Sequence, residues 1–167
     1  TPASASAMVD SMATYWVVPS TDFLWRVASD NPGFALTTAD GLVAASAVGE
    51  AIVWLTVGSR KECYLVPNVV VMPNCPDVLY STRTMRDLYG FKHLLDQAPP
   101  AIHVPGALNI PVDDDGMAFK IDVAFEPTGA PRPRRLRTPR ASVPVAQMSE
   151  AAAFPAGVAG TTQATLF

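Results

Sequence analysis

The residues that could do chemistry begin with an acid beside a hydroxyl. Asp10 follows the apolar Val9, precedes Ser11, and stands shortly before the β-like run 14–18. A carboxyl at the end of a strand can act as a general acid or base, and two carboxyls close together can share one proton and activate water. Asp10 is therefore either a catalytic carboxylate or an acid at the edge of a strand in a non-enzymatic β-domain.

Other reactive groups point to no metal and no cofactor. Cys63 and Cys75 are too few for the disulfide framework of a secreted domain, so we expect two buried thiols in an intracellular protein, with one bridge as the alternative. His93 and His103 have neither each other nor a cysteine at zinc-site spacing. The acidic run 113–115 lacks the alternating spacing of a calcium loop and predicts a solvated turn.

The composition is that of a chain with a core. Of 167 residues, 49% are hydrophobic and 16% are charged, which does not describe a disordered chain. The length suggests one domain plus an extension. No apolar run approaches the roughly 20 residues that a membrane span needs. The chain starts at Thr1 with small, polar residues, which we interpret as a processed end, a polyprotein fragment or a cloning boundary.

Charge divides the chain into two parts. Residues 1–127 carry seven Lys/Arg and fourteen Asp/Glu, whereas residues 128–167 carry five Arg and one Glu, giving net charges of -7 and +4. The second part is rich in Pro, Ala and Gly, and we interpret it as a tail or linker. Its five Arg fall within residues 132–140, without interleaved aromatic residues. A solvated linker, a contact with nucleic acid and docking on a larger assembly all stay open.

The elements that would position the acid are mostly strands. Runs rich in β-branched and aromatic residues recur, bounded by Gly, Pro or Asn. The pair Asp40-Gly41 predicts a hairpin turn, since Gly tolerates the positive φ of tight turns. Gly49 and Gly58 predict breaks between strands. Within residues 62–73, the pair Pro67-Asn68 predicts two short strands, because Pro favours strand ends and edges.

One helix is predicted over about residues 82–89. Ser81 or Thr82 can cap its first turn, and Gly90 is suited to its end. Two further stretches read as strands, with the acidic turn between them: residues 101–112 and 117–127.

In order and spacing, these pieces resemble the retropepsin-like protease of copia-type retrotransposon polyproteins. That family has an apolar-Asp-Ser-Gly-Ala-Thr segment, then, about thirty residues on, a TADG segment and a Gly-bearing strand. Here the segments are VDSMAT and TTADGLVAASAVGEAIVWL. The family continues with an apolar strand ending in Pro, Leu-x-Ser and a short helix closed by Gly, which residues 69–91 match. The resemblance spans about residues 8–125.

The resemblance implies a mostly β fold: a closed antiparallel β-barrel of retropepsin type with one short helix over residues 1–127, and an irregular C-terminal extension over 128–167. The chain would be an aspartic endopeptidase domain that processes a retroelement polyprotein. Only one Asp-Ser element is present, so the second carboxylate would come from Asp10 of another copy in an isologous homodimer. A hairpin between Asn31 and Val48 would cover the peptide substrate as a flap.

Residue by residue, the resemblance makes Asp10 the catalytic acid and Ser11 its bracing hydroxyl. The residues that would contact substrate are Met12, Ala13 and Thr14. The chain departs from the family where Met12 replaces Gly and Trp16 stands in the place of His. If position 12 needs positive φ or close backbone approach, a Met there is strained. The alternative is an inactive retropepsin-like scaffold that binds a larger assembly through residues 128–167.

Overall fold

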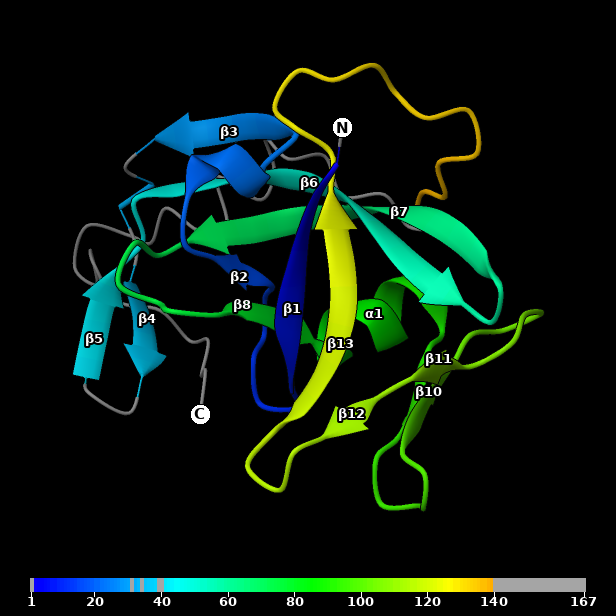
Figure 1. The fold of residues 1–167 in the computed structure, drawn as a ribbon. Coiled ribbons are helices and arrows are strands. Elements are labelled where there is room, and N and C mark those ends of the chain that lie inside the picture. Colours follow the sequence, from blue (N-terminus) through cyan, green and yellow to red (C-terminus); the bar gives the residue numbers. More distant parts are fainter. Residues whose placement is uncertain (1, 31, 34, 39–40, 140–167) are drawn as a thin grey trace.

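The structure is a computed structural model that describes residues 2–30, 32–33, 35–38 and 41–139 (Figure 1). Asp40 and residues 140–167, which include most of the predicted extension, lie outside this part of the chain. The strands are β1 (Ala3–Asp10), β2 (Val17–Val18), β3 (Arg26–Asp30), β4 (Ala35–Thr38), β5 (Gly41–Ala44), β6 (Ala47–Val57), β7 (Arg60–Val71), β8 (Val78–Ser81), β9 (Lys92–Leu94), β10 (Ala101–His103), β11 (Ile110–Pro111), β12 (Asp113–Asp114) and β13 (Phe119–Phe125). The helices are the 3-10 turn η1 (Thr21–Phe23) and α1 (Thr82–Tyr89).

Six strands close into a barrel. They follow the order β13-β1-β8-β2-β7-β6, and β6 pairs with β13 to complete the circle. Most neighbours are antiparallel, but β1 pairs with β8 and β2 pairs with β7 in parallel. The predicted mostly β fold, with a closed barrel and one α-helix among the described residues, is confirmed.

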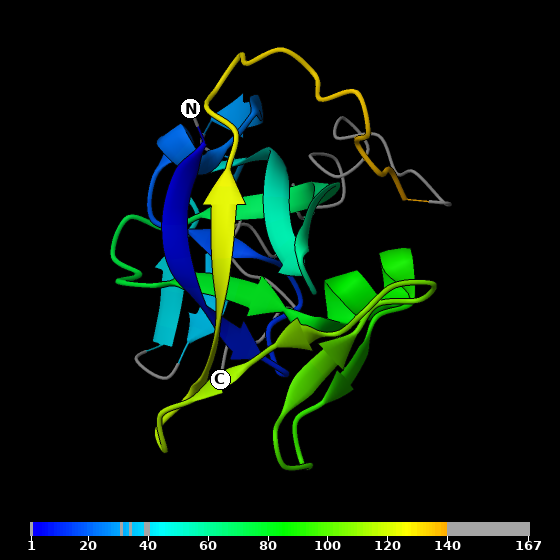
Figure 2. The same cartoon turned by 45° about the vertical axis from the view of Figure 1, so that its right-hand side comes forward.

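Two smaller sheets extend from the barrel. β9, β10 and β11 form a three-stranded sheet, and β4 and β5 form a separate hairpin on another side (Figures 1 and 2). Thr38 pairs with Gly41 across this hairpin, so the hairpin predicted there is present. The helix α1 begins at its N-cap Ser81 and ends at Gly90, which has a φ of 71°. Both ends agree with the prediction.

The core fills the barrel with large aromatic side chains. Trp16 is fully buried, and its ring centroid lies 4.9 Å from that of Tyr80 and 6.3 Å from that of Phe125. Cys63 is buried, Cys75 is half-buried, and both are free thiols, as expected. No helix among the described residues is long and apolar enough to cross a bilayer.

The start of the chain corrects one prediction and shortens another. Residues 3–10, taken as a polar end, form β1, which pairs with both β13 and β8. Ala and Ser have low strand propensity, so pairing on both sides explains a strand that the local sequence does not indicate. In the predicted run 14–18, only Val17 and Val18 form a strand.

Two predicted strand breaks are also wrong. β6 runs through Gly49, where a Cβ would come within 2.2 Å of the Arg26 carbonyl oxygen, so glycine permits the close approach of β3. β7 runs through Pro67-Asn68 as one strand. Pairing shifts between Ala51↔Val66 and Gly49↔Val69, which leaves two residues opposite one. The bulge, with Asn68 at a φ of 62°, accommodates the proline inside the strand.

Residues 128–139, here called the arm, lie against the barrel. The Thr128 hydroxyl donates to the Leu24 carbonyl at 2.6 Å, and the Trp25 indole donates to the Ala130 carbonyl at 2.7 Å. Farther on, Arg137 bridges β7: its N–H donates to the Cys63 carbonyl at 3.0 Å, and its carbonyl accepts from the Leu65 N–H at 2.9 Å. The predicted boundary at residue 127 stays a prediction, but these contacts attach the arm to the body.

Candidate functional site

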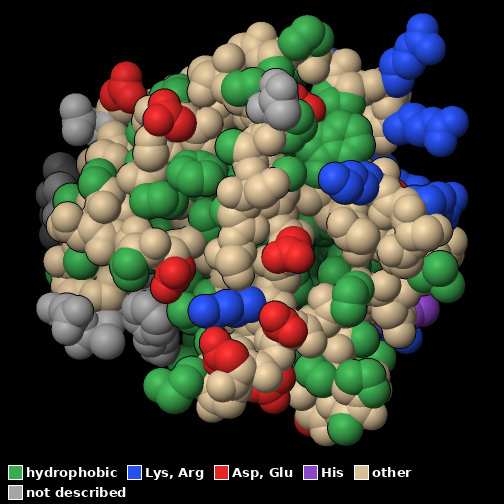
Figure 3. Space-filling model, in the orientation of Figure 1, with side chains coloured by type: hydrophobic (Ala, Val, Ile, Leu, Met, Phe, Trp, Pro, Cys, Tyr) green, Lys and Arg blue, Asp and Glu red, His purple; other side chains and the backbone are tan. Residues whose placement is uncertain are grey.

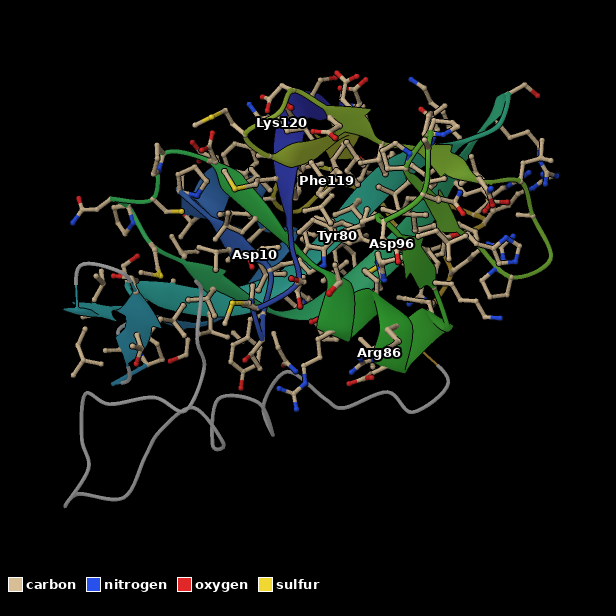
Figure 4. The ribbon with its side chains drawn as sticks, turned by 90° about the horizontal axis from the view of Figure 1, so that it is seen from below. Asp10, Tyr80, Arg86, Asp96, Phe119 and Lys120 are labelled. Carbon is tan, nitrogen blue, oxygen red and sulfur yellow. The ribbon has the colours of Figure 1, made fainter. Side chains whose placement is uncertain are left out.

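Asp10 is the last residue of β1. Parallel pairing with β8 sets Asp10 opposite Ser81, so both strands end at the same edge of the sheet. Figure 4 shows Asp10 beside β8 and the start of α1. The loop that follows β1 and the helix that follows β8 therefore leave the sheet side by side. This parallel pair is the local arrangement that presents the carboxyl.

Side chains of the β8–α1 junction hold the loop after Asp10. The fully buried Ser81 hydroxyl donates to the Ala13 carbonyl at 2.7 Å and accepts from the Thr84 N–H at 3.1 Å, which caps α1. The Thr84 hydroxyl donates to the Thr14 carbonyl at 3.1 Å. The sequence indicates Ser81 as a cap, but its second bond joins residues 68 positions apart and has no local signal.

The two oxygens of the Asp10 carboxyl have different surroundings. Oδ1 accepts from the Met12 N–H at 2.8 Å and from the Ala13 N–H at 3.2 Å. Oδ2 is buried and has no hydrogen-bond partner in the described part of the chain. Burial raises the pKa of Asp10, against the two N–H bonds, which lower it. A carboxyl in this state retains its proton more readily than a solvated one, as acid–base chemistry requires.

The predicted neighbours of Asp10 differ in exposure. Ser11 is exposed, and its hydroxyl makes no hydrogen bond within the described residues, so the bonds that brace the loop come from the β8–α1 junction. Ala13 is fully buried, and Thr14 is half-buried. Met12 is 58% exposed. Substrate could therefore meet the Met12 side chain, whereas at Ala13 only the backbone is open to contact.

Met12 is not strained. Of the non-glycine residues that the structure describes, only Asn68 has positive φ, so the backbone at Met12 suits any L-residue. The Gly of the family pattern is therefore not required here for backbone conformation within one copy. Any effect of Met12 on catalysis has to come from the volume of its side chain.

One copy of the chain offers Asp10 no second carboxyl. The causes that shift the pKa of Asp10 are burial and two backbone N–H groups, and they include no charged side chain. The nearest titratable influence runs the other way, because the charge of Asp10 contributes to raising the pKa of Cys75, after burial. A carboxyl pair at this position would need a second molecule.

The β4–β5 hairpin packs against the same loop. Leu36 of β4 is buried in a cluster with Ala13 and Val17, and Val43 of β5 and Tyr15 pack against that cluster. The hairpin is thus anchored by its apolar face next to the segment that follows Asp10. It lies within the interval predicted to contain a flap.

No protein-family model matches the chain, and neither a curated protein nor a solved structure does. The resemblance drawn from the sequence therefore serves only as a basis for proposal.

Proposed function

We propose that the chain is an aspartic endopeptidase domain of retropepsin type that works as a homodimer, with one Asp10 from each copy. The observation that carries this proposal is the buried Oδ2 of Asp10, which has no partner in the described chain while Oδ1 is held by two N–H groups. Buried polar atoms without partners are rare and need an explanation. A carboxyl from a second copy, sharing one proton, would supply the missing partner.

The chemistry follows from that shared proton. Two carboxyls in contact cannot both ionise, so one is an acid and the other a base. The base would take a proton from a water molecule as its oxygen attacks the peptide carbonyl carbon. The acid would give its proton to the carbonyl oxygen, forming a tetrahedral diol. Collapse of the diol breaks the C–N bond as the leaving nitrogen is protonated, and the shared proton is restored.

The β4–β5 hairpin would act as the flap over the substrate. Its base packs against the loop after Asp10, and Leu42 of β5 is exposed. An extended peptide lying between the hairpin and the Asp10 loops would pair its backbone as an added strand. The exposed Met12 would face this peptide and restrict the size of the residues beside the scissile bond.

The test is cleavage of a peptide mixture by the purified chain at acidic pH. We expect cleavage that a statine-type inhibitor blocks and that Asp10→Asn abolishes. Asp122→Asn is the matched control, because it makes the same change at an exposed position of β13 and should retain activity. Cleavage that persists in Asp10→Asn would refute the role of Asp10.

A second candidate is the inactive scaffold, which the exposed Met12 beside Asp10 favours. In this case the chain would be a dimer or a subunit of a larger assembly without peptidase activity. Statine binding separates the two functions: tight binding that depends on Asp10 supports the peptidase, and a folded chain without binding or cleavage supports the scaffold.

A further inference from the structure

Basic side chains from two distant parts of the sequence gather around one hollow. It has a volume of about 320 Å³. Its lining comes from the β6–β7 hairpin and the arm: Trp54, Arg60, Lys61, Glu62, Cys63, Pro133, Arg134, Arg135 and Arg137. We call this the basic hollow. Figure 3 shows Lys and Arg gathered in the upper right, on the side where Figure 1 draws the arm.

The arm is fixed in place by its backbone at this point. The Arg137 peptide bridges β7, and the Tyr89 hydroxyl donates to the Arg137 carbonyl at 3.0 Å. The Arg137 guanidinium lies 5.9 Å from the ring centre of Tyr64. Arg134 and Arg135 are therefore held opposite the β6–β7 hairpin rather than spread along a free linker.

The hollow has a surplus of positive charge. Glu62 is its one lining acid, and it is already paired with Arg137 at 3.1 Å and Arg60 at 3.7 Å. Lys61, Arg134 and Arg135 form no ion pair within the residues that the structure describes. Their charges are therefore open to an anionic ligand, although the net charge of the whole chain is -3.

Trp54 adds an aromatic surface next to these charges. Its indole N–H donates to the Glu126 carboxylate at 2.8 Å, which fixes the orientation of the ring. Trp54 and Lys61 also line a neighbouring hollow of about 490 Å³ along β1 and β13. The half-buried ring thus stands between two adjoining hollows, with cations on one side. No aromatic residue of the arm suggests this arrangement, because Trp54 comes from β6.

We propose that the basic hollow and Trp54 bind single-stranded nucleic acid, with phosphates on Arg134, Arg135 and Lys61 and a base stacked on Trp54. Stacking platforms beside a cationic groove are what sequence-tolerant binding of single strands requires. An acidic peptide would satisfy the cations but has no use for an oriented indole. The site is independent of Asp10, so it does not rest on the proposed peptidase function.

The experiment measures binding of the full chain to a labelled oligothymidylate of about 12 nucleotides. The comparison probes are an abasic oligomer of equal length and a polyglutamate peptide of equal charge. We expect the oligothymidylate to bind at least about fivefold more tightly than either probe, since stacking contributes per base. Its binding should quench tryptophan fluorescence, and this quenching should be absent in Trp54→Phe.

Variants separate the two parts of the site. Arg134→Ala with Arg135→Ala should reduce the slope of log affinity against log salt by roughly 1, as expected for lost phosphate contacts. Trp54→Ala should weaken binding by roughly fivefold to a hundredfold, and Trp54→Phe should restore most of it. Arg83→Ala with Lys92→Ala removes two charges outside the hollow and is the matched control.

Three results would overturn the proposal. One is equal affinity for the abasic oligomer or the polyglutamate peptide, which would make this a general anion surface. Another is an equal loss of affinity in the control pair. The third is quenching by oligothymidylate that persists in Trp54→Phe, a result that does not require Trp54→Ala to fold. Asp10→Asn should bind as the unchanged chain does, so failure of the peptidase proposal leaves this one testable.

Discussion

At the scale of single residues, Asp10 opposes folding when it is ionised. Burial raises its folded pKa, so its contribution to stability is present below the ordinary value of 3.8 and is lost as pH rises through the folded pKa. Asp10→Asn removes the charge and keeps an oxygen for the two N–H donors. We expect the free energy of unfolding at neutral pH to rise by roughly 0.5–2 kcal/mol, the usual range for stabilising changes.

Chemical denaturation at two pH values checks this. The gain should be present at neutral pH and absent at about pH 3, where Asp10 is protonated in both states. Asp122→Asn serves again as the exposed control and should show no comparable gain. A variant that loses stability at neutral pH would mean that the ionised carboxylate is favourable in the fold.

Met12 can be tested in the same way, through the volume of its side chain. Met12→Gly should increase cleavage of peptides with bulky residues beside the scissile bond, because it opens the space that the exposed side chain occupies. It should also lower stability by roughly 0.4–1 kcal/mol, since glycine adds freedom to the unfolded chain. Met117→Gly is the matched control: Met117 is 92% exposed, and its change should affect stability alone. Unchanged selectivity in Met12→Gly would place Met12 outside the cleft.

His93 sets an acid limit on the fold. Burial, and then the charge of Arg86, lower its pKa from 6.5 to about 4, and the buried Tyr80 hydroxyl lies 2.8 Å from its Nε2. Neutral His93 can accept that hydrogen bond, whereas protonated His93 cannot. Between these pH values the unfolded chain binds a proton that the folded chain does not, so stability falls as pH drops. The loss reaches up to roughly 2 kcal/mol after allowance for partial exposure.

Stability measured in steps between the same two pH values tests this limit. His93→Gln keeps an acceptor near Tyr80 but does not titrate, so the slope should flatten. His103→Gln changes the other histidine and should leave the slope in place, because His93 is still present. A slope that is unchanged in His93→Gln would assign the pH dependence to another group.

At the scale of elements, the junction of β8 with α1 couples helix formation to the candidate site. Ser81→Ala removes the cap of α1 and leaves the buried Ala13 carbonyl without its donor. We expect a loss of roughly 2–3 kcal/mol in stability, from the cap and the unsatisfied carbonyl together. Peptidase activity should fall as well, because the loop after Asp10 is held by this bond.

Ser20→Ala provides the comparison for Ser81→Ala. Ser20 caps η1 by accepting from the Asp22 N–H at 3.1 Å, away from the Asp10 loop. This variant should lose about 1 kcal/mol of stability and keep its activity measured well below the unfolding temperature. Equal activity in both variants would show that Ser81 does not position the loop.

The elements also show how far local sequence predicts this fold. The helix and the β4–β5 hairpin were predictable because a cap, a stop and a turn pair are local signals. β1 was not, since its Ala and Ser residues form a strand only through pairing with β8 and β13. Gly49 and Pro67 read as breaks, yet a close strand approach and a bulge accommodate them. The acid itself was predictable, whereas its support from Ser81 required the fold.

At the scale of the whole molecule, attachment of the arm predicts where the folded body ends. A chain ending at residue 127 loses the contacts of Thr128, Ala130 and Arg137 with the barrel, whereas a chain ending at residue 139 keeps them. We expect the shorter chain to be less stable by roughly 1–3 kcal/mol, the sum of a few net hydrogen bonds. Equal thermal unfolding temperatures would mean that the arm adds nothing to the body.

The dimer makes the sharpest prediction, because a site with one Asp10 from each copy is lost in any mixed pair. If unchanged chains and Asp10→Asn chains are mixed and exchange freely, activity should follow the square of the unchanged fraction. An equal mixture at constant total concentration should therefore retain about one quarter of the activity. A monomeric enzyme would retain about one half, and Asp122→Asn in place of Asp10→Asn should retain all of it. The shape of this curve tests the shared proton directly, since only a dyad built across two molecules makes each variant chain inactivate its partner.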